Sequence, residues 1–455
     1  MVRKNIKHTS EFYNSITELC IDNTDGCAQA RRTLLSSNCL TYFSQAITSG
    51  TFFTALLIAM GASETYIGYV TMATTLCMAI QFPAPLFWER LVRRKTALLT
   101  LGVIGDLLTY LGLPCIALLP IALHGKLILY MLLTLATGGI SQFCMPARNA
   151  WTMQSIPFAK RISYTSITSM TQIVINIVSV FMAGAFLDTL EMNSYSAGSL
   201  SPTLTAIFIL RIFACIAALF SSFLMAVHVK EFSYTAEQAP THSLSLLLKP
   251  IKNRQFLSAI LIPCLWALIG GMIGNYFSLY LIETVKMSYT MISSASIIST
   301  PVILLITPVW ARLLRKHNWF KIMAWAILGY CLAYFCNVLI SEKTPYFYFI
   351  AIIIGHLFSP AITMVSNNLI YLYIPEENRT TYFAFYSLLT TFFTLIGQAI
   401  GTCFVTVTTP LHLTFLGIPI GHLQLVSALA AVNGVILAFV LFTRYRVNLS
   451  SHHKS

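Results

Sequence analysis

The stretch WERLVRR at residues 88–94 returns almost unchanged as WARLLRK at residues 310–316, an offset of 222 positions. Both copies crowd charge into a chain in which only 9% of the residues are charged. A second pair, IPFAKRISYTSITS at 156–169 and IPEENRTTYFAFYS at 374–387, repeats at an offset of 218. Two pairs at nearly the same offset indicate an internal duplication, so the two halves of the chain are expected to form similar units.

The remainder of the chain is too apolar for a water-soluble protein. Of its 455 residues 56% are hydrophobic and the mean hydropathy is +0.74, whereas about a quarter of the residues of soluble domains are charged. The apolar runs have the length, roughly 20 residues, at which a helix crosses a bilayer. About twelve membrane spans are expected, at 42–61, 65–87, 96–119, 127–147, 164–187, 203–227, 255–281, 289–310, 321–340, 346–370, 381–406 and 420–443.

The basic residues predict the orientation of these spans, because Lys and Arg accumulate in short cytoplasmic loops. Of the 28 Lys and Arg residues, 24 fall on the side that carries both termini and only Lys126, Lys286 and Lys343 on the other. Both termini are therefore expected in the cytoplasm. The net charge of +13 is explained by loops that face anionic lipid headgroups and does not call for nucleic acid.

Two repeats of six spans, each with a basic loop after its second span, resemble the major facilitator superfamily of secondary transporters. The loop pattern of that family is G-x-x-x-D-R-x-G-R-R; Pro85 and Val92 stand here at its glycine positions, and Ala311 replaces the acid in the second copy. The stretches TALLIAMGASETYIGYV and WTMQSIP resemble a bacterial branch without an assigned substrate. The loop residues that fit the pattern are Glu89, Arg90, Arg93 and Arg94 in the first copy, and Arg312, Arg315 and Lys316 in the second.

The resemblance implies an all-α membrane protein built from two pseudo-symmetric six-helix bundles. The expected domains are a cytoplasmic tail at 1–41, bundles at 42–228 and 255–443, a central cytoplasmic loop at 229–254 and a second tail at 444–455. Within the tail, AQARRTLLSSNCL is expected to lie on the membrane surface. The basic loops are expected to brace one half against the other, or else only to anchor the chain to lipid headgroups.

In this fold the solute site lies near the membrane midplane, lined by the first and fourth helices of each half. Polar side chains in the spans should face protein or water, since exposure to lipid is costly. They either contact solute or join helices by hydrogen bonds. The candidate solute-binding residues are Gln45, Gln142, Gln172, Asn176, Asn275, Tyr276, Tyr280, His356, Thr363 and Asn367.

Three ionisable residues lie deep in the spans. His356 could couple protons to transport, because its ordinary pKa is close to neutral pH, or could be a neutral imidazole that a neighbouring hydroxyl or carbonyl satisfies. Asp106 and Arg211 each need a partner, since an isolated charge in the membrane costs several kcal/mol. We expect them to form an ion pair within the N-terminal half, or else to occupy separate solvated positions.

These features predict an alternating-access transporter of a small polar solute, with protons as a candidate coupling ion. The alternatives are a multidrug or metabolite efflux antiporter, whose span-5 pattern G-P-x-x-G-G has a partial match in GQAIG at 397–401, and a membrane sensor without transport. An enzyme is not expected, because no His–carboxylate cluster occurs. The scattered cysteines predict no disulfide framework, metal site or cofactor. We expect a monomer in the bacterial cytoplasmic membrane.

Overall fold

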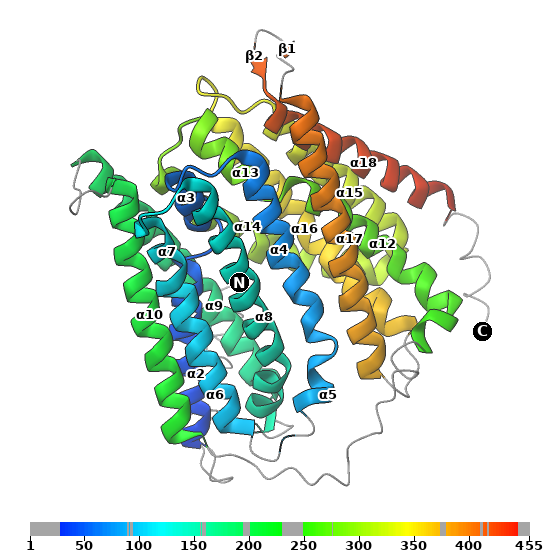
Figure 1. Ribbon diagram of the computed structural model, residues 1–455. Coiled ribbons are helices and arrows are strands. Elements are labelled where there is room, and N and C mark those ends of the chain that lie inside the picture. Colours follow the sequence, from blue (N-terminus) through cyan, green and yellow to red (C-terminus); the bar gives the residue numbers. More distant parts are fainter. Residues whose placement is uncertain are drawn as a thin grey trace, which may run out of the picture. The chain divides into compact units, whose positions relative to one another are not determined.

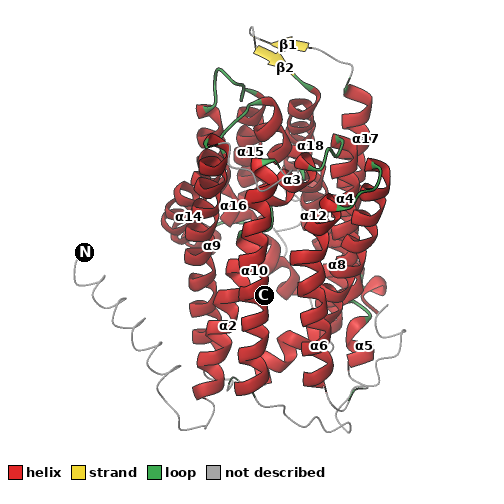
Figure 2. Ribbon diagram, turned by 60° about the vertical axis from the view of Figure 1, so that its left-hand side comes forward, coloured by secondary structure: helices red, strands yellow, loops and turns green. Residues whose placement is uncertain are grey.

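The protein is almost entirely helical in its computed structural model (Figures 1 and 2). The two strands of the described part, β1 (Leu413–Phe415) and β2 (Ile418–Ile420), form a small antiparallel hairpin. The predicted all-α fold class is confirmed. The structure describes residues 28–88, 91, 94–154, 156, 161–193, 201–229, 249–274, 276–373, 379–409, 413–415 and 418–444.

In the described part, 10 helices are long and apolar enough to cross a membrane. They correspond, in order, to the third through twelfth of the predicted spans. The first two predicted spans consist of shorter pieces. The first is divided between α2 (Ala28–Ala46) and α3 (Thr51–Ala59). The second comprises α4 (Glu64–Met78), the 3₁₀ turn η1 (Ala79–Gln81) and most of α5 (Ala84–Trp88).

The first helix starts far earlier than hydropathy predicts, which corrects the expected tail boundary at residue 41. The segment expected to lie on the membrane surface forms the first turns of α2. Arg31 of this segment is fully buried. The Ser37 hydroxyl lies 2.6 Å from that of Ser221, and Ser44 donates to the Ala214 carbonyl at 2.8 Å. These small polar residues let two helices approach closely, which explains why a weakly apolar segment packs as a helix.

By its internal contacts the chain divides into two compact units. Unit 1 comprises the described residues of Met1–Met60 and Pro83–Pro240. In it α10 packs on α2 and α6, and α8 packs on α6 (Figure 1). Besides α2 and α3 it contains α5 (Ala84–Trp88), α6 (Arg94–Leu107), the π-helical turn η2 (Leu108–Gly112), α7 (Leu113–Cys115), η3 (Ile116–Leu118), α8 (Leu123–Gln154), α9 (Arg161–Met192) and α10 (Pro202–His228).

Unit 2 comprises the described residues of Gly61–Phe82 and Thr241–Ser455. Its closest pairs include α12 with α17, and α15 with both α16 and α18. Besides α4, η1 and the hairpin it contains η6 (Lys249–Lys252), α12 (Arg254–Ile273), α13 (Tyr276–Leu279), the π-helical turn η7 (Tyr280–Thr284), α14 (Tyr289–Lys316), α15 (Trp319–Val338), α16 (Tyr346–Tyr373), α17 (Arg379–Thr408) and α18 (His422–Arg444).

The placement of α4 in unit 2 differs from the bundle expected at 42–228. In both Figure 1 and Figure 2 the helix runs beside α17, with which it packs. The Gln398 amide of α17 donates to the Thr75 hydroxyl of α4 at 2.8 Å, and both side chains are buried. The packing of α4 therefore places this helix in unit 2, whereas the sequence repeat predicts that it belongs to the first half. The division of the chain into two halves of six spans is inferred from the sequence duplication and stays a prediction.

Each unit contains the same tryptophan contact, which matches the sequence repeat. In unit 1 the Trp88 indole N–H donates to the Phe143 carbonyl of α8 at 2.7 Å. In unit 2 Trp310 donates to the Leu357 carbonyl of α16, also at 2.7 Å. The two tryptophans open the repeated stretches WERLVRR and WARLLRK. The two copies of the repeat therefore share an indole–carbonyl hydrogen bond between equivalent spans as well as identical residues.

The second repeat also joins equivalent helices. The Tyr164 hydroxyl of α9 accepts a hydrogen bond from the Asn38 amide of α2 at 2.8 Å. Its counterpart Tyr382 of α17 packs edge-on against Phe256 of α12, with the ring centroids 4.8 Å apart. In each unit the repeated tyrosine therefore fastens the fifth span of the repeat to the first.

Candidate functional site

The seventh span is interrupted toward its end, at the twentieth of the 27 residues expected at 255–281. Helix α12 ends at Ile273, its C-cap Gly274 has φ 43° and ψ −134°, and α13 begins at Tyr276. Glycine adopts this positive φ without the steric penalty that other residues incur. The Gly274 N–H reaches the Gly270 carbonyl at 3.5 Å, a long hydrogen bond. Backbone that leaves the helix at membrane depth is tolerated only where protein covers it or where it lines a polar cavity.

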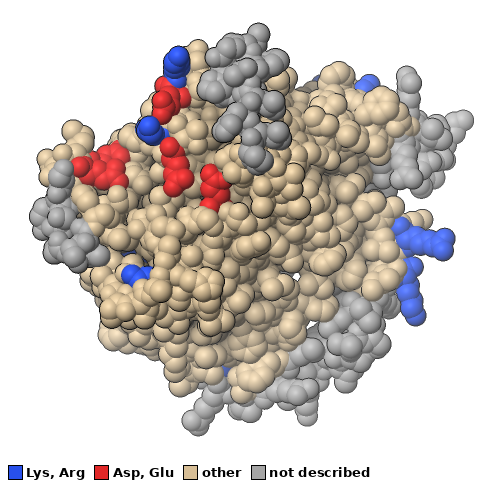
Figure 3. Space-filling model, turned by 45° about the horizontal axis from the view of Figure 1, so that its top comes forward, with Lys and Arg blue, Asp and Glu red and all other residues tan. Residues whose placement is uncertain are grey.

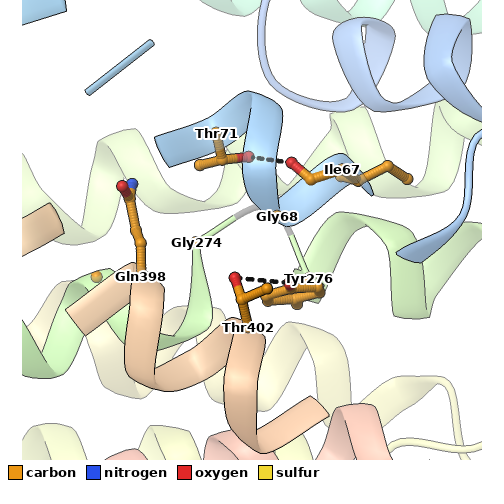
Figure 4. Close-up of a pocket in the computed structure, with 8 residues that line it drawn as sticks. Ile67, Gly68, Thr71, Gly274, Tyr276, Gln398 and Thr402 are labelled. Atoms are coloured by element: carbon orange, nitrogen blue, oxygen red, sulfur yellow. Dashed lines mark hydrogen bonds between the residues drawn. The ribbon is translucent and has the colours of Figure 1, made fainter. Parts of the chain in front are cut away.

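Such a cavity lies beside the interruption, between α4, α12 and α17 of unit 2 (Figure 4). Its volume is about 10 Å³, close to the minimum that holds one water molecule. Among the described residues, those that line it carry no charge: Ile67, Gly68, Thr71, Gly271, Gly274, Tyr276, Gln398 and Thr402.

Two hydrogen bonds fasten helices together across this cavity. The Tyr276 hydroxyl donates to the Thr402 hydroxyl of α17 at 2.9 Å, and both side chains are buried. The Gln398 amide, one turn earlier on α17, donates to Thr75 of α4. Tyr276 and α4 are in such close contact that a Cβ added at Gly68 would lie 1.9 Å from the Tyr276 oxygen. Glycine is therefore required at position 68 for this arrangement.

Glycine also sets the distance between α12 and α17. A Cβ at Gly397 would lie 2.0 Å from the Leu268 carbonyl oxygen, and one at Gly401 would lie 2.1 Å from that of Met272. The two backbones thus touch without an intervening layer of side chains, as is common where small residues recur at membrane-helix contacts. The stretch GQAIG, which the sequence relates to an antiporter pattern, has a packing role here and carries Gln398 between its two glycines.

Ionisable side chains gather at the end of unit 2 where α4 begins. The Glu64 carboxylate pairs with His422 at the start of α18, and Glu64 acts electrostatically on Glu283 and Tyr276. Figure 3 shows acidic side chains gathered on the face that Figure 1 has at its top. Sequence reasoning missed this group, because Glu64 and His422 are 358 positions apart.

Residues 34–398 match the model of the Major Facilitator Superfamily. The chain belongs to this superfamily. The match covers more than half of the chain, and it confirms the membership that the repeated loops indicate.

Solved structures with the same fold are transporters of diverse solutes. A mutant form of the nucleoside transporter NupG has a TM-score of 0.66 at 15% identity, over 91% of this chain and 99% of that one. A bacterial homologue of the iron transporter ferroportin, facing inward, scores 0.66 at 14% identity, over 90% and 97%. A D-xylose–proton symporter scores 0.65 at 13% identity, over 91% and 97%. No curated protein sequence matches the chain.

Among the candidate solute-binding residues that the structure describes, only Tyr276 lines the cavity between α4, α12 and α17. Tyr280 is buried, and its hydroxyl donates to the Ile340 carbonyl. The His356 Nδ1 lies 2.9 Å from the Ile352 carbonyl of its own helix, so this nitrogen carries a proton that it donates. Gln142 is half-buried and Asn275 lies outside the described residues. The exposed candidates are Gln45, Gln172, Asn176, Thr363 and Asn367.

The expected ion pair between Asp106 and Arg211 does not form. The buried Arg211 guanidinium donates to the Thr109 carbonyl at 3.0 Å, and the cation that acts electrostatically on Asp106 is Arg148. The interrupted hydrogen bonding of the π-helical turn that contains Thr109 makes its carbonyl available as an acceptor. A π-helical turn cannot be predicted from hydropathy, so the sequence indicated the Asp106 carboxylate as the partner of Arg211 instead.

The loop characteristic of the superfamily is described only in part, because Glu89, Arg90 and Arg93 lie outside the described residues. Arg94 Nε donates to the Leu91 carbonyl at 3.1 Å. Its neighbour Lys95 donates to the Ala226 and Val229 carbonyls, both at 2.7 Å, and so caps the C-terminal end of α10. In the second copy Arg312, Arg315 and Lys316 are exposed at the end of α14.

Proposed function

We propose that this superfamily member carries a small polar solute across the membrane by alternating access. The observation that carries the proposal is the interruption of the seventh span beside a polar cavity. Interrupted helices supply unpaired backbone groups, and secondary transporters use such groups to bind solutes and ions. The candidate solute residues that are exposed, among them Thr363 and Asn367, have room to contact a ligand.

The chemistry of these residues favours a neutral or zwitterionic solute. The candidates are amides, hydroxyls and one imidazole, and none carries a fixed charge. The three similar structures are named for a nucleoside, iron and D-xylose, so the fold itself does not select a solute class. Export of drugs or metabolites is the second candidate, because GQAIG partly matches an antiporter pattern.

The proposal includes a location and an orientation. We place the protein in a bacterial cytoplasmic membrane as a monomer, with both termini in the cytoplasm and the basic loops against anionic lipid headgroups. The basic loops adjust the balance between inward-facing and outward-facing states.

The test is uptake of a panel of labelled nucleosides, sugars and amino acids into proteoliposomes that contain the purified protein. A thermal-shift screen against the same compounds selects the solutes to label. We expect at least one to be taken up faster than into protein-free liposomes. Thr363→Ala and Asn367→Ala, which remove exposed groups without opening a cavity, should lower its apparent affinity, and Thr443→Ala near the end of α18 serves as the control.

Uptake that occurs only in vesicles of inverted orientation would favour export. A ligand that binds but is never transported, in either orientation, would contradict the proposal and favour a sensor.

A further inference from the structure

One oxygen of the cavity has no hydrogen-bond partner among the described residues. Gln398 is 7% exposed, and its buried Oε1 is without a partner in the part of the chain that the structure describes. The assignment of the two amide atoms follows from Thr75, whose hydroxyl proton is donated to the Thr71 carbonyl at 3.0 Å. The Thr75 oxygen can then only accept, so it faces the amide Nε2. In Figure 4 the Gln398 side chain extends from α17 toward α4.

The hydroxyls of the cavity also present lone pairs, because their protons are used elsewhere. Tyr276 donates to Thr402 (Figure 4). Thr402 in turn directs its proton to the Met72 sulfur at 4.0 Å. A hydroxyl has a single proton and two lone pairs, so the Tyr276 and Thr402 oxygens at the cavity each keep a lone pair that can accept.

The backbone adds negative potential at the same place. The cavity lies at the C-terminal end of the 20-residue helix α12, where Gly271 and Gly274 line it. The last carbonyls of a helix have no partner within it, and the dipole places about half a negative charge there. The Glu64 carboxylate acts on the Tyr276 hydroxyl from the start of α4, and the described lining contains no Lys or Arg.

A buried amide oxygen without a donor costs about 1–3 kcal/mol. A water molecule, a solute N–H group or a metal cation could each satisfy it. The cavity is too small for a solute, and the negative end of a helix favours a positive charge over a neutral water. Divalent cations bind mainly through carboxylates, and the described lining offers none.

We propose that this cavity binds a small monovalent cation, Na⁺, through the Gln398 amide oxygen, neighbouring hydroxyl oxygens and the carbonyl end of α12. The cation is the coupling ion of the proposed transporter, and this role rests on the proposed function. Because the site joins α4, α12 and α17, bound Na⁺ stabilises unit 2 by holding these three helices together.

The experiment measures the thermal unfolding of the purified full-length protein in chloride salts of Na⁺, K⁺ and choline at equal ionic strength. Na⁺ should raise the midpoint in a saturable manner, and choline should not. Gln398→Met, which keeps the volume but removes the amide, should weaken Na⁺ binding by about tenfold or more, as expected for a lost bond to a charged group. Gln398→Glu keeps an oxygen in place, adds a negative charge and should bind Na⁺ at least as tightly as the wild type.

The matched control is Gln424→Met. Gln424 is another buried glutamine of unit 2, and its amide donates to the Val338 and Ile340 carbonyls, away from the cavity. Its loss should lower the midpoint but leave the increment from Na⁺ unchanged. A wild-type midpoint that is the same in all three salts would overturn the proposal in favour of a bound water. A full Na⁺ increment in Gln398→Met would overturn it as well.

If Gln398→Met does not fold, binding of radioactive ²²Na⁺ to Gln398→Glu decides, and binding weaker than wild type would refute the site. All these measurements are made without solute or gradient. A failure of solute uptake therefore does not affect the conclusion about Na⁺ binding. A failure of Na⁺ binding likewise does not affect the conclusion about solute uptake.

Discussion

Replacement of Gly397 by alanine should separate two helices that now touch through their backbones. The new Cβ would lie 2.0 Å from the Leu268 carbonyl oxygen, so the helices must move apart by about 1.4 Å to reach the ordinary contact distance of 3.4 Å. The obstacle is backbone, which cannot rotate away as a side chain can. Overpacking of this kind costs typically 1–3 kcal/mol. We expect Gly397→Ala to destabilise the protein by at least this amount.

Gly270→Ala is the control, because a Cβ at Gly270 meets nothing within 4 Å. Alanine favours a helix interior over glycine by about 1 kcal/mol, so this variant should be as stable as the wild type or slightly more stable. The assay is the unfolding midpoint of each purified variant in detergent, followed by tryptophan fluorescence. If both alanines shift the midpoint in the same direction by the same amount, α12 and α17 do not touch as described.

Three further predictions concern topology, the basic loop and the span-10 histidine. In a background without native cysteines, a cysteine at Ser194 should react with an impermeant thiol reagent in intact cells and one at Thr96 should not; the reverse pattern would invert the orientation. Arg90→Ala should lower transport turnover with substrate affinity nearly unchanged, since the loop is roughly 15 Å from the midplane, and a loss of binding with normal turnover would speak against gating. His356→Gln should leave the pH profile of uptake unchanged, because the imidazole is hydrogen-bonded within its own helix; a lost pH dependence would show that it couples protons.

The sequence predicts most of the fold because its strongest signals are local. Ten of the predicted spans reappear among the described residues as helical segments long and apolar enough to cross a membrane, since a run of apolar residues selects a membrane helix whatever its neighbours are. The duplication is equally visible, and the hydrogen bonds of Trp88 and Trp310 confirm it in space. The family follows from the same repeated loops.

The sequence fails where a structure depends on residues far apart in the chain. Hydropathy cannot place Arg31 inside a packed helix, because its burial depends on the partners of α2. The cavity escaped prediction for the same reason: Gln398 becomes significant only when Thr75, 323 positions earlier, lies beside it. Polarity alone selected Gln172 and Asn176, which are exposed, and passed over Thr402, which lines the cavity.

The tryptophan contact of each unit has a consequence for how the two copies can diverge. Its donor is a side chain, but its acceptor is a main-chain carbonyl, a group that every residue supplies. Mutation at the acceptor position therefore leaves the bond intact. The two acceptors, Phe143 and Leu357, are 214 positions apart, so they lie about one helical turn out of register with the second repeat, and the indole uses a different carbonyl of the equivalent helix in each unit. Selection therefore needs to retain only the tryptophan of each copy, whereas the residue that supplies the carbonyl can be substituted.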